Sequence, residues 1–223
     1  MFFIKPGALL FIDSSNFYHS LKFQNDLPFD EKGYARLFKE LSTYFEIKEI
    51  NFYDAMKNID KDPTGYAKQQ RFHSNLTKVD SRVKIKTRKL RYATSISKEK
   101  SNKVAKEIGL QTSLRDKLYL FLKKLNVIKH SHEKGLDVLL IVDALKAHKE
   151  KKSDIILILS GDSDYVPAVE YMQGEGAKII NLHTLTGSSK ELRDTCFEHI
   201  LIDVDTTGKV SLAKSKNMAK RAT

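Results

Sequence analysis

Short, continuously apolar runs constrain this chain most, because such runs are stable only where both faces are covered. Residues 8–12 (ALLFI) form one run, and residues 154–159 (DIILIL) form another after a leading aspartate. Runs of this kind are typical of strands inside a parallel sheet. Further strands are predicted at residues 47–53, 82–92 and 177–182.

Segments with helical periodicity separate these strands. The predicted helices cover residues 16–23, 34–45, 63–76, 110–127, 136–147, 166–173 and 192–202. Ser188 and Glu191 form a capping box before the last one. The helix at 136–147 is apolar on nearly all sides, so we expect it to be buried. The alternation of strand and helix predicts an α/β, Rossmann-like three-layer fold with a central parallel sheet.

Two stretches depart from this pattern. Residues 94–107 are polar and lysine-rich and are predicted to form a loop or mobile insertion, with limits at about 93–109. After residue 205 apolar residues become sparse, and five basic residues occur without an acidic one. We therefore predict one domain over residues 1–205 and a disordered basic C-terminal tail over residues 206–223.

The composition indicates a cytoplasmic protein. Cys196 is the one cysteine, so no disulfide can form within the chain, as is usual in a reducing compartment. No run approaches the ~20 apolar residues of a membrane span. Residues 1–6 are too short for a secretory signal before the first predicted strand.

The chain carries 39 Lys and Arg against 28 Asp and Glu, a formal charge of +11. Such an excess favours polyanionic partners, because bound phosphates release counterions; the simpler alternative is that it only aids solubility. The candidate nucleic-acid surface is the strand at 82–92 together with the loop that follows it through Lys106, and Tyr92 is available to stack on a base. Its basic residues are Arg82, Lys84, Lys86, Arg88, Lys89 and Arg91, and Lys98, Lys100, Lys103 and Lys106 follow. A charged edge strand that resists aggregation would have the same composition.

Acidic residues follow two of the predicted strands. Asp13 comes directly after the first apolar run, and Asp162 and Asp164 come after the run at 154–159. Ligands bind at the carboxyl ends of the strands in open α/β sheets. If the two strands are neighbours, three carboxylates meet there, and a hard divalent cation would relieve their repulsion. The alternative is that each aspartate caps the helix that follows it.

Asp137 adds a fourth carboxylate at the start of the helix at 136–147. Asp143 lies six residues on and points about 120° away, so both cannot face one ion. Asp143 could instead be hydrogen-bonded or support the residues that bind the ion. Asn16 could orient a carboxylate or bind a phosphate-bound water; an ordinary helix cap is the alternative.

Other metal and phosphate motifs are weak. His130 and His132, or Cys196 with His199, lack a second ligand pair at the spacing of a structural zinc site. The glycines at 174 and 176 precede a strand, which makes them a turn rather than a phosphate loop.

Three blocks together resemble a known family. Residues 11–18 (FIDSSNFY), 134–138 (KGLDV) with Asp143, and 160–165 (SGDSDY) are similar to the motifs of the NYN domain, in the LabA-like branch of the PIN-like nuclease superfamily. The resemblance covers about residues 8–203. It implies a Rossmann-like sheet with an acidic cluster at its carboxyl end, Mg²⁺ or Mn²⁺, and cleavage or binding of RNA. By matching position, the site would be formed by Asp13, Asp137, Asp162, Asp164 and Asn16.

Two positions depart from the family pattern. Ser14 stands where a glycine is frequent, so the backbone has less freedom there. In the predicted helix 192–202, Phe197, Glu198 and His199 are arranged differently from the usual aspartate near a phenylalanine. The site would then have one carboxylate fewer.

The first hypothesis is a metal-dependent ribonuclease acting on single-stranded or structured RNA. Asp13, Asp162 and Asp164 would hold the metal directly or through water, with Asp137 completing the cluster. Lys134 would offset phosphate charge. The second hypothesis is an RNA-binding regulatory module without turnover. A phosphatase is disfavoured, because Ser15 stands where an Asp-x-Asp nucleophile motif needs its second aspartate. The oligomeric state stays open, with a homo-oligomer among the alternatives.

Overall fold

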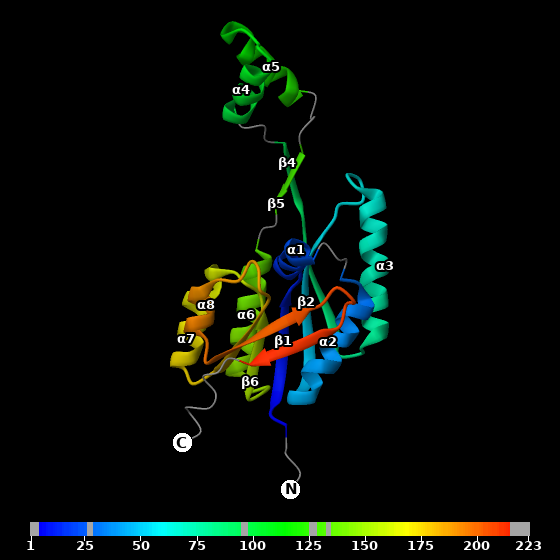
Figure 1. Ribbon diagram of the computed structural model, residues 1–223, viewed down its shortest axis with the longest axis vertical. Helices are drawn as coiled ribbons and strands as arrows, with labels where there is room; N and C mark the ends of the chain where they lie inside the picture. Colours follow the sequence, from blue (N-terminus) through cyan, green and yellow to red (C-terminus); the bar gives the residue numbers. More distant parts are fainter. Residues whose placement is uncertain (1–4, 26–28, 95–97, 125–128, 133–134, 215–223) are drawn as a thin grey trace. The chain divides into compact units, whose positions relative to one another are not determined.

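The computed structural model describes residues 5–25, 29–94, 98–124, 129–132 and 135–214. The chain divides into two compact units, residues 1–88 with 135–223, and residues 89–134. Figure 1 traces both, and each unit is described by itself. None of the described helices is long and apolar enough to cross a bilayer.

The first unit is built on a seven-stranded sheet in the order β3-β2-β1-β6-β7-β8-β9. Its strands are β1 (Gly7–Asp13), β2 (Glu46–Met56), β3 (Val83–Lys89), β6 (Ile155–Leu159), β7 (Lys178–His183), β8 (Glu198–Val204) and β9 (Val210–Lys214). The pairs β1–β2, β1–β6, β6–β7 and β7–β8 are parallel, and β8–β9 is antiparallel. The predicted α/β fold with a mainly parallel sheet is confirmed.

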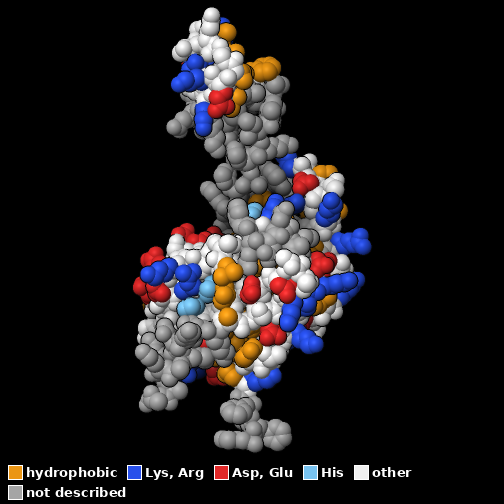
Figure 2. Space-filling model, viewed as in Figure 1, with side chains coloured by type: hydrophobic (Ala, Val, Ile, Leu, Met, Phe, Trp, Pro, Cys, Tyr) orange, Lys and Arg blue, Asp and Glu red, His pale blue; other side chains and the backbone are white. Residues whose placement is uncertain are grey.

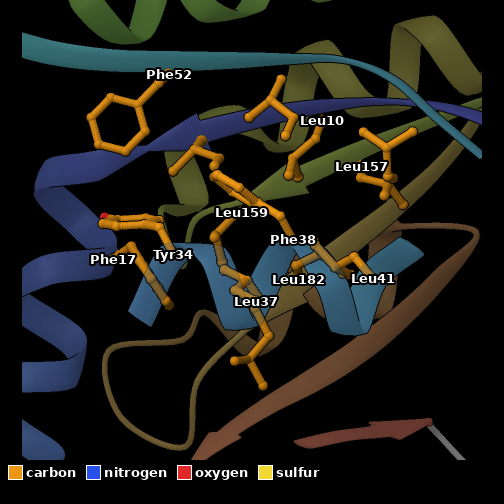
Figure 3. Close-up of a cluster of buried hydrophobic side chains, with 14 of the residues drawn as sticks. Leu10, Phe17, Tyr34, Leu37, Phe38, Leu41, Phe52, Leu157, Leu159 and Leu182 are labelled. Atoms are coloured by element: carbon orange, nitrogen blue, oxygen red, sulfur yellow. The ribbon is translucent and has the colours of Figure 1, made fainter. Parts of the chain in front are cut away.

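Helices cover the sheet on both faces. They are α1 (Ser14–Asn25), α2 (Glu31–Tyr44), α3 (Pro63–Val79), α6 (Leu136–Lys149), the short 3-10 helix η1 (Ser163–Tyr165), α7 (Val166–Gly174) and α8 (Lys190–Thr195). Leu10 and Leu157 of the sheet share one core with Leu37, Phe38 and Leu41 of α2 (Figure 3). α6 packs against β1 and β2. The sheet is therefore the middle of three layers.

Helix α6 is less buried than its composition predicts. Leu136, Leu140 and Ala144 are buried against the sheet, but Val138 and Val142 are 65% and 52% exposed. The expectation of a fully buried helix is wrong, because α6 lies in an outer layer and has only one covered face.

The second unit is an inserted ribbon and helical hairpin. β4 (Arg91–Thr94) pairs antiparallel with β5 (Lys129–His132), and α4 (Lys98–Glu107) packs against α5 (Thr112–Lys124). The lysine-rich stretch predicted to be a loop therefore contains a helix, and the strand predicted at 82–92 is divided into β3 and β4. Ala105 of α4 is fully buried, which shows that the hairpin has its own packing contact.

The end of the chain also differs from expectation. Helix α8 ends at Thr195, so only residues 192–195 of the predicted helix 192–202 are helical, and β8 follows. Ile200, Ile202 and Val204 are buried in alternation along β8, which is the period of a strand. The tail predicted to be disordered from residue 206 contains β9, whose Val210 is buried. Residues 215–223 lie outside the described part.

Val210 gives a test of the β9 assignment. Val210→Asp places a carboxylate in the buried edge of the core and should lower the free energy of unfolding by about 2–4 kcal/mol. Ser211→Asn, at the exposed neighbouring position, should change it by less than about 0.5 kcal/mol. Urea unfolding of both variants measures the difference, and equal stabilities would contradict the assignment.

Candidate acidic active site

The candidate site lies where β1 and β6 end side by side. β1 and β6 are parallel neighbours, with Ile12 opposite Leu159, so Asp13 and the loop after β6 meet at the carboxyl edge of the sheet (Figure 1). This is the adjacency that the sequence hypothesis requires. Asp13 is only 6% exposed.

Asp13 is held by three donors from different segments. Its Oδ1 accepts the backbone N–H of Asn16 at 3.1 Å. Its Oδ2 accepts the hydroxyls of Ser160 and Tyr165, each at 3.1 Å. The carboxylate therefore caps α1 and also binds the two segments that follow β6.

Tyr165 connects Asp13 to Asp137. Its buried hydroxyl lies 3.1 Å from Oδ2 of Asp13 and 3.5 Å from Oδ1 of Asp137. Because one hydroxyl carries one hydrogen, it can donate to only one carboxylate at a time. Burial and the charges of both aspartates raise the pKa of Tyr165, so it stays a neutral donor.

Charge repulsion connects the four aspartates through Asp137. Burial raises the pKa of Asp13, and the charge of Asp137 adds to this rise. Burial also raises the pKa of Asp137, followed by the charges of Asp162 and Asp164. Asp137 thus interacts with each of the other three. Within the described part of the chain, none of the four has a salt bridge to a lysine or arginine.

The aspartates do not form a ready-made metal cage. Among the described residues, no group of three or more Asp, Glu, His or Cys side chains is placed to hold a metal ion. Asp162 instead caps η1, since its Oδ1 accepts the N–H of Asp164 at 2.9 Å, and Asp164 is exposed. Asp162 therefore acts as a helix cap while also lying near the other aspartates. The ligand set predicted from the sequence, Asp13, Asp162 and Asp164, is not assembled as a metal cage.

Gly161 fixes the position of the loop after β6. Its N–H donates to Oδ1 of Asn16 at 2.8 Å, and its carbonyl accepts the N–H of Ser189. A Cβ on Gly161 would lie 1.9 Å from the carbonyl oxygen of Gly187. Only glycine allows this approach, so α1 and the loops after β6 and β7 are locked together. Asn16 has this structural role in addition to its cap contact.

A second polar cluster adjoins the site. Asp54, near the end of β2, accepts the amide of Gln69 at 2.7 Å and lies 2.7 Å from Nε2 of His73. Its other oxygen accepts the hydroxyl of Ser14, the residue after Asp13, at 3.1 Å. The sequence hypothesis did not include Asp54 or His73. The position of Asp54 just after the predicted strand 47–53 was the available signal.

Asp143 belongs to a different contact. It accepts the hydroxyl of Tyr53 at 2.8 Å and the ammonium group of Lys86 at 2.6 Å. Lys86 also lies over the Tyr53 ring, 5.7 Å from its centre. Asp143 and Asp137 thus have separate partners, as the angle between them along the helix predicted.

Several basic residues proposed for RNA binding are already engaged. Arg82 binds Asp80 and the carbonyl of Ile47 near the start of β3, and Lys84 pairs with Glu49. These contacts reduce the positive charge that the strand offers to a phosphate.

The other predicted contacts divide by location. Arg88 and Lys89 are exposed at the end of β3. Arg91 and Tyr92 belong to β4, but their side chains lie outside the described part, and so does Lys134.

Two histidines lie beside the Gly161 loop. Nε2 of His183 is 3.1 Å from Nδ1 of His199, and Nδ1 of His183 donates to the carbonyl of Thr184. His183 lines a small pocket with Asn16, Ser160 and Gly187. Burial lowers the pKa of His183 to about 4 and also lowers the pKa of His199. The sequence hypothesis placed His199 in an altered helix, whereas it lies on β8.

Comparison with known proteins bears on this architecture. Residues 8–203 match the family model described as NYN domain. A solved structure of a protein of unknown function from Vibrio parahaemolyticus superposes with a TM-score of 0.58, at 17% sequence identity, covering 95% of this chain and 99% of that one. At this identity the likeness shows the fold alone. No curated protein matches the chain.

Gly161→Ala tests the lock between the loops. The added Cβ must displace the backbone at Gly187, so the free energy of unfolding should fall by about 3 kcal/mol. Gly174→Ala is the control, because a Cβ there meets nothing within 4 Å, and alanine suits the helix better by up to about 1 kcal/mol. Urea unfolding measures both. Similar stabilities for the two variants would refute the lock.

His183 predicts a pH dependence of stability. The unfolded chain binds a proton near the ordinary histidine pKa of 6.5, whereas folded His183 does so only near 4. Stability should therefore be lost as the pH falls through this interval, by about 2 kcal/mol between pH 6.5 and 4.5. His183→Gln should remove most of that slope, and His19→Gln, at an exposed position of α1, should not. An unchanged slope in His183→Gln would contradict the assignment.

Proposed function

The chain belongs to the NYN domain family, which has a PIN-like nuclease fold, and from this premise we propose a metal-dependent ribonuclease. It would hydrolyse phosphodiester bonds of single-stranded or structured RNA with Mg²⁺ or Mn²⁺ at the Asp13 site. A cytoplasmic location is part of the proposal, and the single cysteine supports it.

One observation carries the proposal. Asp13 and Asp137 share the hydroxyl of Tyr165, and repulsion from Asp162 and Asp164 adds to the raised pKa of Asp137. This grouping costs free energy, because like charges oppose ionisation. The charge of Asp137 raises the pKa of Asp13, and the charges of Asp162 and Asp164 raise the pKa of Asp137. A bound cation would relieve that cost, so the arrangement supports a site for a divalent ion.

The chemistry of the donors fits Mg²⁺ or Mn²⁺. All four side chains offer carboxylate oxygens, which hard cations prefer. Mg²⁺ commonly binds through one or two carboxylates and keeps several waters, so a three-ligand cage is not required. Asp13 and Asp137 would hold the ion, with Asp162 and Asp164 acting through water; here Asp137 has a larger role than the sequence predicted.

When bound, the ion would lower the pKa of a water and offset charge on the scissile phosphate. The protein's own groups would set the geometry. Ser160 and Tyr165 keep Oδ2 of Asp13 in place, and the Asn16 N–H orients Oδ1. Asp162 and Asp164 would accept a proton or order water near the attacking group.

A second candidate is an RNA-binding regulatory module without turnover. The absence of an assembled three-ligand group among the described residues favours it. This module would bind RNA in a salt-sensitive manner, and it would not cleave RNA in either metal.

Single aspartate substitutions test the ribonuclease proposal. Asp162→Asn, at the carboxyl end of β6, and Asp13→Asn should each lower cleavage of a labelled RNA by about 100-fold or more, because a charge that stabilises the transition state is lost. Asp154→Asn, exposed at the amino end of β6, is the matched control and should cleave normally.

The assay needs wild-type protein with Mg²⁺, with Mn²⁺ and with EDTA, and thermal unfolding to confirm that the variants fold. Cleavage should stop in EDTA and return with added metal. Equal cleavage by all variants would point to a contaminating nuclease and refute the assignment. RNA binding without turnover in either metal would establish the second candidate instead.

A further inference from the structure

The positive charge of the chain is concentrated outside the unit that holds the aspartates. Residues 89–134, the inserted unit, contain 12 Lys and Arg against 4 Asp and Glu. Residues 1–88 with 135–223, the first unit, contain 27 Lys and Arg against 24 Asp and Glu. The inserted unit therefore holds +8 of the formal charge of +11 in far fewer residues, and it offers the stronger attraction to a polyanion.

The inserted hairpin carries exposed apolar side chains among these charges. On α5, Leu114, Leu120 and Phe121 are 43%, 62% and 58% exposed. Leu114, Lys117 and Phe121 are spaced three and four residues apart, so they share one face of the helix. Figure 2 shows hydrophobic and Lys or Arg side chains together on the visible part of this hairpin.

Helix α4 has the same mixed character. Lys103 and Lys106 are exposed, and so are Val104 and Ile108. No described salt bridge involves Lys103, Lys106 or Lys117. By contrast, Lys84 and Lys86 on β3 are paired with acids. Among the described residues, uncompensated charge thus lies on the hairpin and on Arg88 and Lys89 at the end of β3, whereas Lys84 and Lys86 in the middle of that strand are paired.

We infer that the α4–α5 hairpin is a binding surface for single-stranded nucleic acid, with Lys103, Lys106 and Lys117 on phosphates and Phe121 stacked on a base. The inference rests on the proposed function for the identity of the polymer, RNA. It assigns affinity to the inserted unit and chemistry to the acidic site. A strand held by the hairpin is kept at high local concentration for the rest of the same chain.

Charge and chemistry favour this occupant over others. A second copy of the hairpin would bring together two surfaces of the same strong positive charge, which repel. A lysine surface alone would bind any polyanion, but an exposed aromatic ring beside lysines is the arrangement that stacks unpaired bases. Duplex RNA hides its base faces, so it should gain from the lysines and not from Phe121.

The experiment measures binding of the full-length protein to a fluorescent 15-nucleotide oligouridine and to a duplex of the same length, in EDTA to prevent turnover. The triple variant Lys103→Glu, Lys106→Glu, Lys117→Glu should raise the single-strand Kd by at least about tenfold and lower the salt slope of log K by about 2. Phe121→Ala should raise the single-strand Kd about tenfold and leave duplex binding unchanged.

The matched control is the triple variant Lys32→Glu, Lys39→Glu, Lys78→Glu, which changes net charge equally at exposed positions of α2 and α3. It should raise the Kd by less than about threefold, because the inference assigns the phosphate contacts to the hairpin and none to these lysines. Equal effects of the two triples would overturn the inference. Circular dichroism checks that the hairpin stays helical; if the glutamates unfold it, the Lys→Gln triple replaces them, with the same criterion.

Other occupants give distinct results. Tighter binding to vesicles containing phosphatidylserine than to RNA, or concentration-dependent dimers that Phe121→Ala dissolves, would overturn the nucleic-acid assignment. The result is also separable from the ribonuclease proposal. Oligouridine binding is measured in EDTA, where no cleavage takes place, so the hairpin can pass or fail this test whether or not Asp13→Asn and Asp162→Asn lose cleavage in the metal-containing assay.

Discussion

The site depends on one buried carboxylate at the end of β1. Asp13 is buried and therefore costly to ionise, and its hydrogen-bond donors stabilise the carboxylate. Those donors come from the first turn of α1, from Ser160 after β6 and from Tyr165 in η1. Because their positions are set by one group, the ends of two neighbouring strands are fixed relative to each other.

Around this carboxylate the structure accepts local cost for function. The Gly161–Gly187 contact leaves no space for a side chain, and Asp137 lies where burial and the charges of Asp162 and Asp164 raise its pKa. Unfavourable packing and charge are concentrated at the sheet edge, while the remaining core of Leu10, Leu37 and Leu157 is conventional. Concentrations of this kind occur at functional sites, since stability alone does not favour them.

The acidic site and the basic hairpin divide two electrostatic tasks. A cation site needs negative charge, and a polyanion-binding surface needs positive charge. If both lay in one small unit, the charges of each would weaken binding at the other. Residues 89–134 hold +8 of the chain's formal charge of +11, so most of the excess lies outside the unit that contains Asp13. β3 illustrates the separation, because its Lys84 and Lys86 are neutralised by Glu49 and Asp143.

The sequence by itself determined the sheet and its aspartates. Short, continuously apolar runs are typical of strands inside a parallel sheet. Asp13 and Asp162 follow two such runs, so the sequence predicts that both lie at the carboxyl edge of the sheet. It did not determine the role of Tyr165, the contact of Asp54 with His73, or the strands β8 and β9. Those depend on partners distant in the chain. Only the tertiary structure decides which charges are compensated, because an ion pair depends on the distance between two side chains in space. The sequence gives the identity of a lysine or an aspartate but not whether a partner lies within reach.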